Sequence, residues 1–169
     1  MKIKRDFVTN SSSTSFVVFF PCKIKTIEDV EKYIDPRFAK TILRDALNQK
    51  PYSLKQPCAS KVLLDELTSG HLEAVKIGYD EHQEEFCKRE NITEDDLNSC
   101  MYYRHQMWRE KDIRESARAK KYLAEFIKEI GEDVYVYVFS YSGNDGDYFY
   151  DLEFGGVFHN LKNIPVSHH

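Results

Sequence analysis

Apolar residues form three short runs that are rich in aromatic and β-branched side chains, at 16–20, 134–141 and 148–154. Runs of this kind predict strands. In 134–141 valines alternate with aromatic residues, so both faces are apolar and the strand is expected to lie in the middle of a sheet. The segment 142–146, Ser-Gly-Asn-Asp-Gly, is a turn sequence. The pattern therefore predicts a C-terminal β-hairpin with strands at 134–141 and 148–154.

Between the first strand and the hairpin, apolar residues recur at helical spacing. Short helices are predicted after three residues that favour a helix N-terminus, which are Thr26, Asp35 (followed by Pro36) and Ser60. The middle of the chain is therefore expected to be mainly helical.

A longer helical region is predicted from Thr93 to Gly131. The phase of its apolar residues shifts near Asp112, so we expect two helices that meet there or one kinked helix. Ahead of this region, residues 71–79 alternate as in a strand. The acidic residues 80–90 predict a solvated helix.

The composition fits one domain of ordinary size. The chain has 169 residues, of which 41% are hydrophobic, and such a chain can bury a core without disulfides. We predict a single α+β domain over residues 1–169, with a small mixed or antiparallel sheet packed by several helices. The formal net charge of −4 disfavours nucleic acid as a partner, because nucleic-acid binders carry a basic field.

The sequence favours a reduced, cytoplasmic setting. Cys22, Cys58, Cys87 and Cys100 are widely spaced, which is typical of reduced cysteines and disfavours a four-cysteine zinc site. The N-terminus does not have the pattern of a signal peptide, and the longest apolar run, 16–20, is too short to cross a bilayer. We expect a cytoplasmic protein that does not bind a membrane.

The helical stretch 104–121 is basic and adjoins Tyr102, Tyr103 and Trp108. Such a face can bind an acidic partner or a phosphate backbone. The alternative is a solvated helix whose charges pair with Glu110 and Glu115 at a spacing of four residues. Because exposed helices are usually charged, the alternative is favoured.

Two polar loops resemble ligand-binding loops only in part. Residues 144–147, Asn-Asp-Gly-Asp, lack the alternating ligands and closing Glu of a calcium loop, so a tight hairpin turn is favoured. The serine run at 11–15 lacks the glycines and lysine of a phosphate loop. We interpret it as a polar segment that leads into the strand at 16–20.

Short motifs stand at both ends of the chain. Residues 1–16 read Met-Lys-Ile-Lys-Arg-Asp-Phe-Val-Thr-Asn, then a serine run and Phe. Near the other end come Ser-Gly-Asn-Asp-Gly at 142–146, Leu-Glu at 152–153 and Ser-His-His at 167–169. Together they resemble a family of uncharacterised small proteins from bacteria and their phages, in which Thr14 would be Ser and Phe154 often His. That family has no settled activity.

The resemblance bears on the last residues of the chain. From composition alone, His168 and His169 are typical of a frayed end or an expression tag. A shared Ser-His-His end disfavours both accounts and implies a docked tail. Leu161, Ile164 and Val166 are spaced to anchor such a tail on a sheet.

The first functional hypothesis is a small phage or prophage accessory protein with a polar site at the hairpin and tail. Its candidate ligand-binding residues are Asp145, Glu153, Ser167, His168 and His169. If a divalent metal is the cofactor, Glu153, His168 and His169 are its ligands. Asp145 and Glu153 are too far apart along an extended chain to share one site, so Glu153 is expected beside the tail. Hydrogen bonding is favoured over a metal, because two adjacent histidines supply an incomplete shell.

The second hypothesis is a non-enzymatic binder or inhibitor of a host protein. It would act through the charged helix around Trp108 or through a sheet edge. No nucleophile–base pair or nucleotide loop supports an enzyme class.

Overall fold

The chain forms two compact units in a computed structural model that describes residues 13–68, 72–142 and 156–168. The sheet unit comprises Met1–His71 and Ile130–His169, and the helical unit comprises Leu72–Glu129. The expected α+β class is confirmed. The expectation of a single domain over 1–169 stays a prediction.

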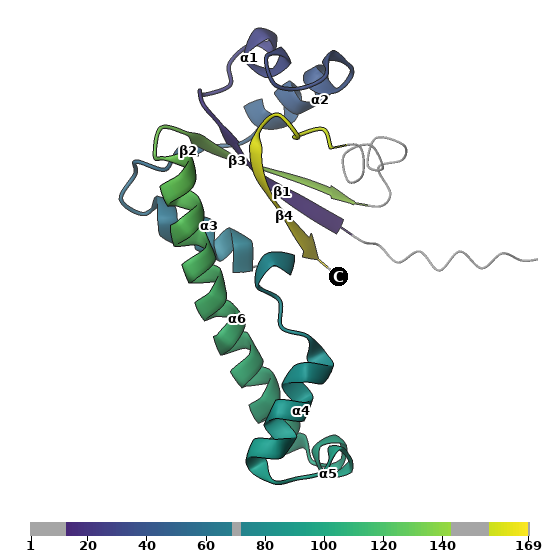
Figure 1. The fold of residues 1–169 in the computed structure, drawn as a ribbon. Coiled ribbons are helices and arrows are strands. Elements are labelled where there is room, and N and C mark those ends of the chain that lie inside the picture. The colour runs from purple at the N-terminus through teal and green to yellow at the C-terminus, as the bar shows by residue number, and fades with distance from the viewer. Residues whose placement is uncertain (1–12, 69–71, 143–155, 169) are drawn as a thin grey trace, which may run out of the picture. The chain divides into compact units, whose positions relative to one another are not determined.

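The described part of the sheet unit contains four strands and three complete helices, and Figure 1 shows their arrangement. Its elements are β1 (Ser13–Phe20), α1 (Ile27–Glu31), α2 (Pro36–Leu47), β2 (Tyr52–Ser53), α3 (Ala59–Thr68), β3 (Tyr135–Ser142) and β4 (Lys162–His168). The helical unit is built from the 3-10 helix η1 (Glu73–Val75), α4 (Tyr79–Glu90), α5 (Glu94–Ser99) and α6 (Met101–Ile130). Only the last residue of α6 belongs to the sheet unit.

The sheet has the order β2-β3-β1-β4, and each neighbouring pair is antiparallel. β1 therefore lies between two strands from the far end of the chain, with Val17 opposite both Val138 and Ile164. The prediction of an inner strand at 134–141 is confirmed, because β3 lies between β2 and β1. The proposed return strand at 148–154 lies outside the described residues.

One face of the sheet carries the aromatic core. Phe16 and Phe20 from β1 and Tyr137 and Phe139 from β3 pack in one cluster with buried residues of α1 and α2. The Tyr137 hydroxyl accepts a hydrogen bond from the backbone N–H of Ile24 at 2.8 Å. This bond gives the buried hydroxyl a partner, without which burial would be unfavourable.

The other face of the sheet is also buried. It carries the alternate residues of β1 and β3, Val17, Phe19 and Val136, which are at most 3% exposed. Figure 1 shows α3 on the side of the sheet away from α1 and α2. The sheet is therefore a middle layer, which explains why its strands are apolar on both faces.

Two of the three predicted helix starts, at Thr26 and Asp35, are confirmed by their caps. Ser60, expected to precede a helix, instead lies inside α3. Thr26 and Asp29 form a capping box at α1, and Asp35 accepts a hydrogen bond from the backbone N–H of Arg37 at 2.9 Å, with Pro36 as the first residue of α2. α4 ends at Asn91, which has a left-handed φ of 54°.

Three further sequence predictions were wrong in detail. α6 is continuous through Asp112, and the helical region is broken instead at Cys100, which has extended backbone angles. Residues 71–79 form no strand where they are described, because the N–H of Ile77 donates to the Glu115 carboxylate at 2.8 Å rather than to a neighbouring strand. Residues 13–15, expected in a loop, belong to β1.

The central position of β3 can be tested with Val136→Asp. Val136 is 1% exposed, and an unpaired buried carboxylate there should cost on the order of 5 kcal/mol, comparable with the whole stability of a domain. We expect the variant to lose cooperative unfolding of the sheet unit in calorimetry.

Pro165→Asp is the matched control, since Pro165 lies exposed on β4 of the same sheet. It should melt within a few degrees of the natural protein. A cooperative melt at the natural temperature for Val136→Asp would contradict the buried position of this side chain.

Candidate functional site

An exposed aromatic surface lies on the first half of α6. Met101, Arg104, His105 and Trp108 stand three, four and seven residues apart, so they share one side of the helix. They line a shallow hollow of about 380 Å³. We call these four residues, together with Tyr79, the Trp108 face.

Trp108 is held in place but not covered. Its ring centroid lies 5.3 Å from that of Tyr79, and the Lys111 ammonium lies 5.9 Å from its ring centroid. The indole is nevertheless 46% exposed, and the neighbouring Met101 is 72% exposed. Large apolar side chains that remain exposed in a group mark interaction surfaces more often than isolated ones do.

The charges of the helical unit fall into two groups. One group is bound to carboxylates: Lys88 pairs with Glu84 at 2.6 Å, and the pairs Arg89–Glu110, Lys111–Glu115 and Arg114–Glu85 are each 2.7 Å long. In the described part of the chain, Arg104 and Arg109 have no such partner, and both are exposed. The predicted pairing at a spacing of four residues is confirmed for Glu115, which binds Lys111, but not for Glu110, which binds Arg89 of α4. Arg104 and Arg109 lie at or next to the Trp108 face.

A polar network, of which only His82 is buried, joins α4 to α6. His82 is 1% exposed, and its Nε2 lies 3.0 Å from the carbonyl oxygen of Met107, the residue before Trp108. Its Nδ1 lies 3.1 Å from the Arg114 guanidinium, which also donates to Glu85 at 2.7 Å. The bond from Arg114 holds the pKa of the Glu85 carboxyl below its usual range. These contacts hold the backbone that carries Trp108 against α4.

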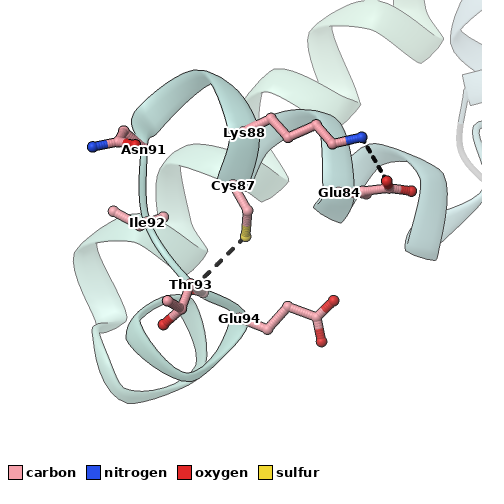
Figure 2. Close-up of a pocket in the computed structure, with 7 residues that line it drawn as sticks. All are labelled: Glu84, Cys87, Lys88, Asn91, Ile92, Thr93 and Glu94. Atoms are coloured by element: carbon pink, nitrogen blue, oxygen red, sulfur yellow. Dashed lines mark hydrogen bonds and ion pairs between the residues drawn. The ribbon is translucent and has the colours of Figure 1, made fainter.

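A second hollow, of about 450 Å³, lies where α4 turns into α5 (Figure 2). Figure 2 shows Glu84 and Lys88 joined to each other, and Cys87 directed towards the carbonyl of Thr93. Burial raises the pKa of the Cys87 thiol, so it stays protonated and is a poor nucleophile. The residues that line this hollow therefore make the contacts of a turn between two helices, and we assign them no catalytic role.

The sequence-predicted site residues are only partly described. Asp145, Glu153 and His169 lie outside the described residues. Ser167 and His168 lie on β4, opposite Thr14 and Ser13 of β1. The prediction of a docked tail is confirmed for the backbone through His168, and Leu161, Ile164 and Val166 are buried as expected.

The register brings the serine run and the tail to one end of the sheet. Ser13 lies opposite Ser142 on one side and His168 on the other. Two residues further into the sheet, the Ser15 and Ser140 hydroxyls form a hydrogen bond of 2.8 Å. Among the described residues, no three His, Cys, Asp or Glu side chains are grouped as metal ligands. The side chains of the three proposed metal ligands, Glu153, His168 and His169, are not in that set.

The sequence did not lead us to predict that His82 and Arg114 are in contact. Residues 80–90 were expected to form a solvated helix, but α4 buries His82, Phe86 and Cys87. The spacing of four residues between His82 and Phe86 was the available signal for a buried face. Nothing in the sequence signals that His82 meets Arg114, which lies 32 residues away.

Comparison of the chain with protein-family models, with curated proteins and with solved structures gives no match. Over the described ranges, no helix combines the length and the apolar character that a membrane span requires.

The two arginines at 109 and 114 should differ in their effect on stability. Arg109→Ala should change the free energy of unfolding by less than about 0.5 kcal/mol, because it is exposed and unpaired in the described structure. Arg114→Ala should cost about 1–3 kcal/mol, because it leaves the buried Nδ1 of His82 without a donor. Urea unfolding followed by Trp108 fluorescence measures both. Equal effects of the two substitutions would contradict the network.

Proposed function

We propose that the protein is a non-enzymatic protein-binding module and that the Trp108 face is its contact surface. The observation that carries the proposal is a half-exposed Trp108 that is ordered by Tyr79 and bordered by Arg104 and Arg109, which have no ion-pair partner among the described residues. Tryptophan and arginine are the residues most enriched among those that dominate binding energy at interfaces. A fixed aromatic ring also loses little conformational entropy when a partner covers it.

The chemistry of the face favours a partner that presents acidic and large apolar side chains. Arg104 and Arg109 offer guanidinium groups that can bind carboxylates in a bidentate manner. Met101 and Trp108 offer apolar area between them. A nucleic-acid backbone is less well suited, because α4 and α5 of the same unit have acidic first turns.

The cellular setting rests on the family resemblance. A bacterial or phage relative would act in the cytoplasm, and its partner would be a host protein. Inhibition or remodelling of that host protein is the activity we assign to the module within this proposal. The resemblance supports the setting, and the geometry supports only the type of partner.

The proposal predicts the kind of peptide that the protein selects from a random displayed library. We expect enriched peptides to combine Asp or Glu with large apolar residues. In anisotropy measurements with such a labelled peptide, Trp108→Ala should raise Kd about thirtyfold, which corresponds to ~2 kcal/mol. Arg104→Glu with Arg109→Glu should abolish binding, because the charge of the rim is reversed.

Two control variants lie on the same helix outside the Trp108 face. Ile113→Ala removes another exposed apolar side chain, and Lys120→Glu with Lys121→Glu reverses exposed charges further along α6. Both should leave Kd nearly unchanged. Selection of basic peptides, or equal loss of binding in the controls, would contradict the proposal.

A second candidate is a small-ligand site at the end of the sheet. It is supported by the register that sets Ser13 opposite Ser142 and His168, next to the Ser15–Ser140 hydrogen bond. Serine hydroxyls and an imidazole are suited to a small polar ligand or, together with a carboxylate such as Glu153, to a divalent cation.

Elemental analysis of the tag-free full chain tests the metal form of this candidate. If a metal is held by the tail, the purified protein should contain it in near-equal amount, and His168→Ala with His169→Ala should lose it. A metal-free protein that also fails to bind added Zn²⁺ would contradict the metal form. Full occupancy in the double variant would place the metal elsewhere.

A further inference from the structure

The Trp108 face follows the axis of α6. Met101, His105 and Trp108 are separated by four and then by three residues, which is the spacing of the side chains that meet where two helices pack along each other. All three are exposed, and we call them the seam residues. The next position of this series is the exposed carboxylate Asp112. The seam therefore ends after Trp108 and covers about two turns, roughly 10 Å along the helix.

The backbone beneath the seam residues is already hydrogen-bonded within the protein. The N–H of Arg104 donates to the carbonyl of Cys100 at 3.2 Å, and the residues that follow are bonded within α6. An extended segment laid on such a surface would lose water from its own N–H and carbonyl groups without gaining partners for them, which is unfavourable. A helical partner avoids this cost, because its backbone is bonded internally.

Arg104 and Arg109 flank the seam on opposite sides, because one precedes His105 and the other follows Trp108. Both are exposed, and the described residues provide neither with an ion-pair partner. In a parallel pair of two copies of α6, Arg104 would lie opposite Arg109 of the second copy. In an antiparallel pair each flank would meet the same flank. Like charges therefore disfavour self-pairing, whereas Asp or Glu beside the seam of another helix would be paired.

We propose that the Trp108 face binds an amphipathic α-helix of another protein, which presents large apolar side chains along its own seam and Asp or Glu on both sides of it. The inference names the partner of the same surface, and it therefore rests on the proposed function. The partner segment can be short, because the seam covers only about two turns. Isolated helices of fewer than about 12–15 residues are marginal in water, so a short segment becomes ordered when it binds.

Three designed peptides, each about three heptads long, test this inference with the full-length protein. The first has Leu along its seam and Glu on both flanks, the second has Lys in place of Glu, and the third has the composition of the first in a shuffled order without helical period. In anisotropy measurements the natural protein should bind the Glu peptide at least about tenfold more tightly than the other two. Far-UV circular dichroism should show that the Glu peptide gains helix in the complex.

Charge reversal gives the sharper result. Arg104→Glu with Arg109→Glu should reverse the preference, so that the Lys peptide binds at least about tenfold more tightly than the Glu peptide. Lys120→Glu with Lys121→Glu, further along α6, is the matched control and should keep the natural preference. If the reversed variant fails to fold, Arg104→Gln with Arg109→Gln should bind both peptides equally. Equal binding of the shuffled peptide, or a reversed variant that still prefers the Glu peptide, would refute the helical partner.

The failure of this inference is distinguishable from the failure of the proposed function. Acidic, apolar library peptides that bind through Trp108 without gaining helix, and that tolerate Pro at a central position, would refute the helical partner and leave the proposed function intact. A protein that selects no peptide and binds none of the designed ones would refute both. A natural protein that dimerises, and that Trp108→Ala makes monomeric, would place a second copy on the face and refute the partner proposed here.

Discussion

The sheet depends on β1 being paired along both edges. Its eight residues, Ser13–Phe20, take their hydrogen-bond partners from β3 and β4, which begin at Tyr135 and Lys162. A strand that is apolar on both faces is stable only where both edges and both faces are covered, because unpaired backbone groups are costly away from water. The long helical insertion between β2 and β3 must therefore return the chain to this strand before the core is complete.

The helical unit depends more on polar contacts, and less on apolar burial, than the sheet unit does. Its apolar cluster is small, with Phe86, Leu97 and Met107 fully buried. Around it, α4 and α6 are joined by the bonds among His82, Arg114 and Glu85 and by the Arg89–Glu110 pair. Exposed ion pairs each contribute little, but a buried imidazole needs its partners. The specificity of the α4–α6 contact therefore resides in the polar network more than in apolar area.

The difference between the two units explains why we place the binding surface on the helical unit. The sheet unit uses its aromatic residues for its own core, and the edge of β3 is partly closed because the N–H of Val138 donates to the Gln49 side chain at 2.9 Å. The helical unit instead leaves Trp108 and Met101 exposed beside Arg104 and Arg109, for which the described part of the chain offers no ion-pair partner. Of the described surfaces, the Trp108 face is the one on which apolar area and unsatisfied charge coincide. It offers a partner both kinds of contact.

Local features of the chain could be predicted from its sequence, because they depend on neighbouring residues. The caps at Thr26 and Asp35, the alternation in 134–141 and the α+β class belong to this group. The helix start at Thr93 also belongs to this group, since Thr93 and Asp96 form the capping box that opens α5. The break at Cys100 rather than near Asp112 was not predicted; it separates Leu97 and Met107, which meet in one buried cluster. Long-range pairing decided the rest. Only the fold sets Ser13 opposite His168 and brings Arg114 to His82, because contacts between distant segments depend on the complete packing of the chain and leave no periodic signal in the sequence.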